Sequence, residues 1–268
     1  MMWKLLLIPV FLYAIILAFL FAFQDRLLFP TKMIGAATAP TGAAALSLQT
    51  PGGETLHGYH IPPTGGSVAP DAPVLIGFGG NGWNAATAAE YLHDLYPDHH
   101  VVVFHYRGYA PSTGRAGAAA LTEDSLLVHD SVARRFPGRR IVAVGFSIGT
   151  GVAAYLGSRR ELAGLILVTP FDSLEAVAAG HYPWVPVRLL FRHPTPSAQW
   201  LRGRGLPVAI LAGEDDTLVR RERTDVLRTA VPNLVFDRTI AGAGHNDIYH
   251  RSDFQAAMAA ALTALERG

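Results

Sequence analysis

Ser147 lies in the pentapeptide GFSIG (145–149), between an apolar run typical of a strand (141–146) and a stretch of helical composition. A serine on a sharp turn between a strand and a helix has its hydroxyl lifted above the sheet, at a helix N-terminus that favours negative charge. The flanking glycines are needed because side chains there would collide with the strand and the helix. This spacing predicts a serine nucleophile for acyl transfer; a turn that merely favours small residues is the alternative.

A serine nucleophile requires a general base, and the base requires an acid that orients it. The strand-like run at 208–211 continues into GEDD, and the run at 234–240 continues into AGAGHND. Because the carboxyl ends of parallel strands meet at one edge of a sheet, we expect Ser147, Asp216 and His245 to lie together there.

The choice of the acid leaves alternatives. Asp215 and Asp216 compete after the same strand, and we favour Asp216 because it lies three residues beyond Gly213, which ends the strand. Asp172 follows the strand-like run at 165–169 and is the other candidate acid. The chain has 11 histidines, and His245 could be one without a special role. We favour it as the base because it follows Ser147 and Asp216 in the chain and lies in a glycine-rich loop.

A glycine-rich segment, GFGGNG (77–82), follows another apolar run and matches G-x-G-x-x-G through Gly77, Gly79 and Gly82. A dinucleotide site needs an acidic residue at the end of the next strand. Arg107 lies near that position instead, and an arginine there would suit only a cofactor with a 2′-phosphate, such as NADP. We therefore interpret the segment as an oxyanion loop, with the backbone N–H groups of Asn81 and Ile148 as the donors. A cofactor cradle is the alternative, and we expect neither a cofactor nor a metal.

Other chemistry-bearing residue types are less informative. His99 and His100 beside Asp98 resemble a metal cluster, but they precede a strand and favour a solvated loop. We assign no chemistry to His57 and His60, which lie on an early hairpin. The chain has no cysteine, which excludes disulfides, thiolate nucleophiles and Cys-based metal sites. Its net charge of +1 implies no nucleic-acid partner.

Alternating strand-like and helix-like segments must position these residues. Two segments flanking PGG (45–50 and 54–62) predict an antiparallel hairpin. Continuous β-branched runs separated by amphipathic helices indicate a mainly parallel sheet of about eight strands, covered on both faces. The predicted strands after the hairpin are 74–78, 101–106, 141–146, 165–169, 208–211 and 234–240. The predicted helices are 84–96, 121–136, 147–162, 220–231 and 253–267.

The N-terminal segment is strongly apolar. Residues 5–23 are about 19 apolar residues without a charge, enough to cross a hydrocarbon core. No small-x-small cleavage site follows, which favours an uncleaved anchor over a cleaved signal peptide or a buried helix. We therefore predict a transmembrane anchor with its juxtamembrane segment (1–30) and a catalytic domain (31–268). Basic residues are nearly balanced around the span, and we expect the domain on the extracytoplasmic side.

An irregular insertion at 180–203 is rich in proline and aromatic residues and departs from the strand–helix rhythm. It either caps the pocket and contacts an acyl chain, or packs only on the core. Its candidate lining residues are Tyr182, Trp184, Leu189 and Phe191, followed by Val185, Val187, Leu190 and Trp200.

With these residues in place, the sequence resembles the α/β-hydrolase fold, and within it the membrane-anchored Bem46-like, ABHD13-like and ABHD17-like acyl hydrolases. The likeness covers nearly the whole chain. It rests on QDRLLFP, GGNG, YRGYAPSTG, GFSIGTG, TPFDSL, YPWVPVRLLFR, GEDDTLV and GAGHND, in that order. Gly79 stands where the family has histidine, and RHPTPSAQW lacks the acidic-aromatic lead expected before Ser197.

The resemblance implies Ser147 as nucleophile, Asp216 as acid and His245 as base, with Asn81 and Ile148 at the oxyanion positions. It implies a serine hydrolase of acyl esters or thioesters that needs no metal. The anchor and the apolar insertion together suggest a lipid-like or lipidated substrate. A peptidase or amidase with the same triad is one alternative, and a non-catalytic membrane scaffold on the same fold is another. The sequence leaves the natural substrate and the oligomeric state open.

Overall fold

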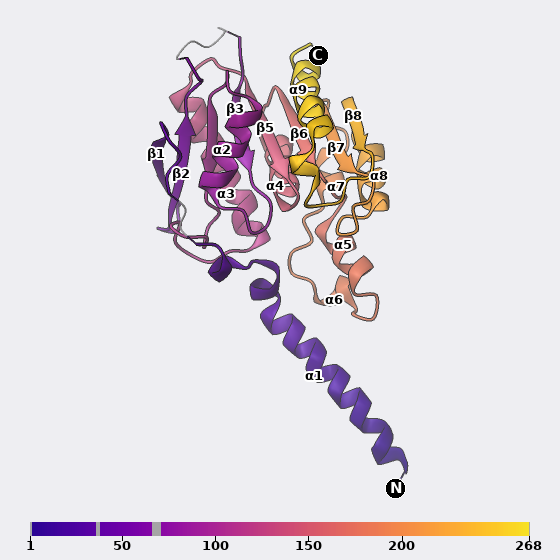
Figure 1. Ribbon diagram of the computed structural model, residues 1–268. Helices are drawn as coiled ribbons and strands as arrows, with labels where there is room; N and C mark the ends of the chain where they lie inside the picture. The colour runs from indigo at the N-terminus through magenta and orange to yellow at the C-terminus, as the bar shows by residue number, and fades with distance from the viewer. Residues whose placement is uncertain (1, 36–37, 66–70, 268) are drawn as a thin grey trace.

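The computed structural model describes residues 2–35, 38–65 and 71–267 (Figure 1). Helix α1 (Met2–Leu28) projects away from the domain and ends at a short 3₁₀ turn, η1 (Thr31–Met33). The helix is long and apolar enough to cross a membrane, with a mean hydropathy of 2.0 and 6% of the apolar window buried. From Ile8 to Leu28, where the side chains are described, most of them are exposed.

An eight-stranded sheet forms the centre of the domain, in the order β1-β2-β4-β3-β5-β6-β7-β8. Its N-terminal hairpin is antiparallel, and β2 pairs antiparallel with β4, whereas the other strands run parallel. The sequence-based prediction of fold class is therefore confirmed. The strands are β1 (Ala44–Gln49), β2 (Thr55–Ile61), β3 (Val74–Phe78), β4 (Val101–Phe104), β5 (Ile141–Phe146), β6 (Gly164–Val168), β7 (Val208–Gly213) and β8 (Leu234–Ile240).

Helices cover both faces of the sheet. One apolar cluster lies between the sheet and helices α3 (Ala118–Arg135), α4 (Ile148–Arg159), α7 (Ser197–Leu201) and α8 (Arg221–Ala230). The other lies between the sheet and helices α2 (Ala85–Leu95) and α9 (Ser252–Arg267), with the 3₁₀ turn η2 (Ile248–His250) at its edge. Strands β3 to β7 are buried on both faces, which explains their continuous apolar sequences.

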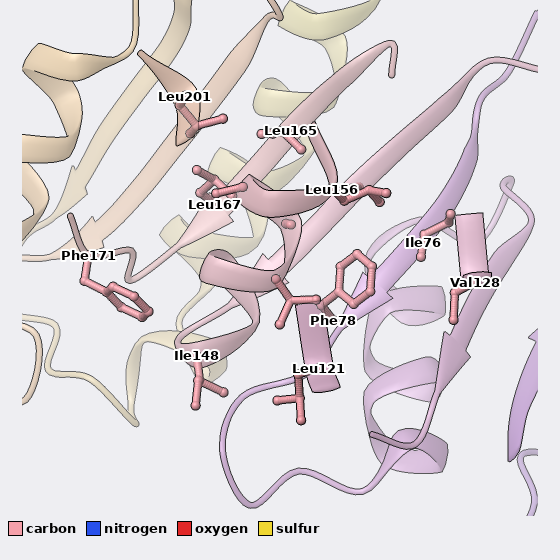
Figure 2. Packing of buried hydrophobic residues seen from close by; sticks show 14 of the residues in the cluster. Ile76, Phe78, Leu121, Val128, Ile148, Leu156, Leu165, Leu167, Phe171 and Leu201 are labelled. Atoms are coloured by element: carbon pink, nitrogen blue, oxygen red, sulfur yellow. The ribbon is translucent and has the colours of Figure 1, made fainter. Parts of the chain in front are cut away.

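The first apolar cluster extends to the sharp turn that carries Ser147. Figure 2 shows Ile148, the residue after Ser147, among buried side chains that include Leu121, Phe78 and Phe171. Only 7% of the Ile148 surface is exposed, so its side chain fixes the first turn of α4 against the core. The position of the Ile148 backbone N–H is thereby set by packing rather than by loop geometry alone.

The insertion divides into two parts with different environments. Helix α5 (Leu174–His181), which the sequence reading did not include among its helices, and α6 (Val187–Leu190) extend below the sheet on the side from which α1 leaves (Figure 1). We call residues 174–192 the cap. The later α7 packs on α4, where the Trp200 ring lies 5.0 Å from the Tyr155 ring, and so belongs to the core.

Candidate active site

The turn at Ser147 has the strained geometry expected of a nucleophile elbow. Its φ and ψ are 51° and −116°, a conformation that non-glycine residues rarely adopt. A Cβ atom at Gly145 would lie 2.6 Å from the Gly149 carbonyl oxygen, and one at Gly149 would lie 2.1 Å from the Phe78 carbonyl oxygen. Both glycines are therefore required by close backbone approach, and the turn raises Ser147 at the carboxyl end of β5.

Three side chains from three strand ends meet at this turn. His245 Nε2 lies 2.9 Å from Ser147 Oγ, and His245 Nδ1 lies 2.7 Å from Asp216 Oδ2. The other carboxylate oxygen of Asp216 accepts the N–H groups of Leu218 and Val219 at 2.9 and 2.7 Å. Asp216 and His245 are each 8% exposed, so the carboxylate is held in one orientation and the imidazole has little freedom to rotate.

The two alternative acids lie elsewhere. The Asp215 side chain is exposed, and its N–H donates to the Ala243 carbonyl oxygen at 2.9 Å. Asp172 Oδ2 accepts from Arg223 Nη1 at 3.1 Å instead of contacting His245. Burial raises the pKa of Asp172 although Arg223 lowers it. Of the three acids considered, the structure thus brings only Asp216 to the imidazole.

The loop carrying GGNG packs directly against the elbow. A Cβ atom at Gly80 would lie 3.7 Å from the carbonyl oxygen of Phe146, the residue before Ser147. Within the described ranges, the backbone N–H groups of Asn81 and Ile148 donate to no other protein group. The Asn81 side chain donates to the Leu28 carbonyl oxygen at 2.6 Å and accepts from the Tyr109 hydroxyl at 3.0 Å. Two free donors beside a serine form an arrangement that suits a developing oxyanion.

The absence of histidine at position 79 has a local explanation. A Cβ atom at Gly79 would lie 3.3 Å from Trp83 Cβ, so an imidazole there would require the tryptophan to move. Trp83 stacks on Phe146 with ring centroids 5.2 Å apart and meets Tyr249 edge-on at 5.0 Å. The Gly79 carbonyl oxygen accepts from the Tyr106 hydroxyl at 2.8 Å. An aromatic group thus takes the space that the family's histidine would need.

Sequence reasoning missed this aromatic cluster beside the triad. Tyr249, four residues after His245, is 6% exposed, and burial raises its pKa to about 12. Its backbone carbonyl accepts from the Tyr91 hydroxyl at 2.7 Å. Neutral phenols and an indole therefore pack on Phe146, the residue before Ser147. The only sequence signal was the aromatic content of the segments after Gly82 and His245.

The candidate cap residues divide into two groups. Tyr182 and Phe191 line a cavity of about 190 Å³ between the cap and α1. Trp184 and Leu189 lie outside that cavity and are 51% and 84% exposed. Val185, Val187 and Leu190 also line the cavity, whereas Trp200 belongs to the core.

The histidines that precede the strand at 101–104 contact other groups and are not gathered around a metal position. His100 Nδ1 lies 3.0 Å from His60 Nε2, and His99 lies 3.9 Å from Glu266. In the part of the chain that the structure describes, no three His, Cys, Asp or Glu side chains are grouped as a metal site would need.

Comparisons with known proteins bear on this geometry. The chain is 31% identical over 241 residues to the uncharacterized protein Rv2307c of Mycobacterium tuberculosis, covering 87% of this chain and 84% of that protein. The esterase Pf2001 of Pyrococcus furiosus superposes with a TM-score of 0.66 over 86% of this chain and 95% of the esterase, at 17% identity. The chain has the α/β-hydrolase fold and belongs to the same family as Rv2307c. No model of a known protein family matches the chain.

The chain resembles serine hydrolases of the esterase and lipase type. It is 30% identical over 144 residues to the lysophosphatidylserine lipase ABHD12 of Danio rerio, covering 45% of this chain and 36% of the lipase. It therefore spans only about a third of the length of that relative. A membrane phospholipase A superposes over 99% of both chains with a TM-score of 0.62 at 15% identity, which shows a shared fold. The similarity to the ABHD proteins is compatible with the membrane-anchored group that the sequence resembles.

Proposed function

We propose that the hydrolase cleaves the carboxylic ester or thioester bond of acyl, lipid-like substrates through an acyl-enzyme at Ser147. The observation that carries the proposal is the continuous line of contacts from Ser147 Oγ to His245 and on to Asp216, at 2.9 and 2.7 Å. The lipase named among the relatives supports a lipid-like acyl group as substrate.

In the first half-reaction, Ser147 Oγ attacks the carbonyl carbon while His245 Nε2 takes the hydroxyl proton. Asp216 keeps the imidazole in the tautomer with a proton on Nδ1 and stabilises the imidazolium that forms. The negative charge that develops on the carbonyl oxygen is stabilised by the N–H groups of Asn81 and Ile148. His245 then gives its proton to the leaving alkoxide or thiolate as the carbonyl carbon–oxygen or carbon–sulfur bond breaks.

In the second half-reaction, water attacks the acyl carbon of the Ser147 ester, and His245 takes a proton from that water. Collapse of the second tetrahedral intermediate breaks the bond to Oγ, and His245 returns the proton to Ser147. The carboxylic acid product leaves with the enzyme in its starting state. Every proton passes through Nε2, so the buried and fixed position of His245 is what the reaction requires.

We also propose that α1 anchors the enzyme in a membrane and that the domain lies on the extracytoplasmic side. The length and apolar composition of α1 support the anchor. Lys4 precedes the apolar run, and Asp25, Arg26 and Lys32 follow it, so the basic residues are nearly balanced around the span. Reporter fusions after residue 268, one active only in the cytosol and one only outside it, test the side on which the domain lies.

The proposed reaction is tested with p-nitrophenyl esters from acetate to palmitate and a fluorophosphonate probe, applied to the wild type and to Ser147→Ala. We expect hydrolysis and labelling in the wild type and loss of both in the variant. The chain length that gives the highest kcat/KM reports the size of the acyl site. A folded wild type that cleaves none of the esters, or a variant that keeps its activity, would contradict the proposal.

A further inference from the structure

The cap lies along the anchor helix over a long stretch. The Tyr13 hydroxyl donates to the Trp184 carbonyl oxygen at 2.6 Å, and the two rings lie 6.5 Å apart. Nearer the domain, Gln24 is only 8% exposed, and its side chain donates to the Leu190 carbonyl oxygen at 3.1 Å and accepts from the Arg192 N–H at 2.8 Å. The cap is thus attached to α1 at two levels.

Tyr13 lies more than half the thickness of a hydrocarbon core away from Asp25, where the apolar run ends. Tyr13 precedes Asp25 by 12 residues in α1, which is about 18 Å of helix at about 1.5 Å per residue. The apolar run between Lys4 and Asp25 is only about long enough to cross a hydrocarbon core of about 30 Å. When α1 crosses a bilayer, Tyr13 therefore lies inside the hydrocarbon, and Trp184 lies there with it.

The surface of the cap fits this placement. Tyr182, Trp184 and Leu189 are 53%, 51% and 84% exposed, an apolar set that water would disfavour. Figure 1 shows α5 and α6 on the side of the domain from which α1 emerges. The polar joint between Asp25 and the side chains of Arg192 and His193, at 2.8 and 2.9 Å, lies nearer the domain. The exposed side chains of the cap tip are thus mainly aromatic or apolar, with Arg188 of α6 as a charged exception, and the ion pairs of Asp25 lie nearer the domain.

Between α1 and the cap lies the cavity of about 190 Å³ described above. Leu20, Phe21 and Leu28 of the helix form one wall. Tyr182, Val187 and Phe191 of the cap form the other. One wall of this groove is therefore the spanning helix itself, and its walls are almost entirely apolar.

One residue, Leu28, connects the groove to the proposed oxyanion loop. Leu28 lines the groove, and its carbonyl oxygen accepts from the Asn81 side chain at 2.6 Å. Asn81 belongs to the loop that packs against the Ser147 elbow. Leu28 therefore lies between the groove and the loop that carries the proposed oxyanion donor.

We propose that this groove binds the acyl chain of an ester lipid that remains in the bilayer, so that the substrate reaches Ser147 laterally from the membrane. The inference rests on the proposed function, which supplies the ester chemistry at Ser147. Its occupant is a lipid acyl chain because one wall is the anchor and the cap tip lies at hydrocarbon depth.

Two neighbouring alanines of α5 offer a matched test of the groove. Ala178 lines the groove, whereas Ala179 faces a different surface beside Leu218 and Arg220. Ala178→Trp and Ala179→Trp are made in the full chain reconstituted in phosphatidylcholine vesicles. For each, kcat/KM is measured on p-nitrophenyl palmitate in the vesicles and on p-nitrophenyl acetate in solution. Ser147→Ala is assayed in parallel.

We expect the palmitate-to-acetate ratio of kcat/KM to fall at least about tenfold in Ala178→Trp and to stay within about twofold of wild type in Ala179→Trp. An unchanged ratio in Ala178→Trp, or an equal fall in both variants, overturns the groove as the acyl site. Acetate hydrolysis that persists in Ser147→Ala contradicts the proposed function instead, so the two failures are distinguishable.

Cap depth has an independent readout, because the chain has no cysteine of its own. Leu189→Cys on the cap and Arg267→Cys at the end of α9 are each labelled with an environment-sensitive fluorophore in vesicles that contain nitroxide-labelled acyl chains. We expect strong quenching at position 189 and none at position 267. Equal quenching at the two positions would place the cap in water and overturn lateral access from the bilayer.

Discussion

The Asn81 side chain donates to the carbonyl oxygen of Leu28 across 2.6 Å, which joins the proposed oxyanion loop to the last turn of the anchor helix. The Tyr109 hydroxyl holds the same amide from its other side at 3.0 Å. The backbone N–H of Asn81, which the proposed reaction uses, is therefore positioned by a residue that also lines the groove between α1 and the cap. Removal of the side chain should disturb the loop without removing the N–H.

We expect Asn81→Ala to lower kcat by roughly ten- to a hundredfold with a smaller change in KM, because a displaced donor weakens transition-state stabilisation. Asn84→Ser is the matched control. Asn84 also donates from its amide to the juxtamembrane chain, at the Gly35 carbonyl oxygen, and serine preserves its role as the N-cap of α2. The check is kcat and KM of both variants, measured on a soluble ester. Equal losses of kcat in both variants would show that the effect comes from losing a hydrogen bond to the juxtamembrane chain, and not from displacing the Asn81 N–H.

The two acids considered for the triad give a second paired prediction. Asp216→Asn should lower kcat by about 10⁴-fold, since asparagine favours the wrong imidazole tautomer. Asp172→Asn removes a carboxylate that pairs with Arg223 and should change kcat by no more than a few-fold. The check is kcat on the same ester, with circular dichroism to show that both variants are folded. A large loss in Asp172→Asn alone would reverse the assignment.

The positions of Ser147, Asp216 and His245 could be predicted from the sequence because each depends on a local pattern. Ser147 and Asp216 each follow a strand whose residues are buried on both faces, so an apolar run marks the strand and its end marks the site. His245 instead follows the edge strand β8, where only Ile240 is buried, and the glycine-rich segment AGAGHND marks its place. The carboxyl ends of parallel strands must then share one edge of the sheet. Apolar runs likewise predicted the six strands after the hairpin, and the two segments flanking PGG predicted the hairpin itself.

The contacts of the anchor could not be predicted in this way. Gln24 and Asp25 end an apolar run, and nothing in their neighbours shows that they bind the cap some 170 residues later, at Leu190 and Arg192. The role of the insertion also depends on tertiary contacts. Two of its candidate pocket residues, Trp184 and Leu189, face outward, while Tyr182 and Phe191 line the groove. Amphipathic periodicity is too weak in such short helices to assign their faces.

A buried histidine outside the site should make stability depend on pH. His105 is 3% exposed, and burial together with the nearby His57 lowers its pKa from 6.5 to about 4. The unfolded chain therefore binds a proton at this position between about pH 6.5 and 4 that the folded chain does not. The contribution to stability is complete above about pH 6.5 and is lost as the pH falls toward 4.

We expect the urea midpoint of the chain in detergent to fall between pH 7.5 and pH 5, and to fall less in His105→Phe, which keeps a ring but no titrating group. His60, whose pKa burial also lowers to about 4, keeps part of the dependence in the variant. His250→Phe, at an exposed position, should retain the wild-type dependence. An identical fall in all three proteins would remove His105 as a cause.

The close approach of the elbow to β3 gives the last prediction. A Cβ atom at Gly149 would lie 2.1 Å from the Phe78 carbonyl oxygen and 2.8 Å from that of Gly79, so Gly149→Ala must push the elbow away from the oxyanion loop. We expect a loss of at least about 1–3 kcal/mol of unfolding free energy. A displacement of about 1 Å between Ser147 and the oxyanion donors should lower kcat by about a hundredfold in addition.

Gly180→Ala in α5 is the control for that variant, because a Cβ atom there meets nothing within 4 Å. Alanine in this helix should leave kcat unchanged and raise the unfolding free energy by about 0.5–1 kcal/mol. Denaturant unfolding and ester hydrolysis are measured on both variants. If Gly149→Ala were as stable and active as Gly180→Ala, the carbonyl groups of Phe78 and Gly79 would have room to move. The close contact would then not be what fixes Ser147 relative to Asn81.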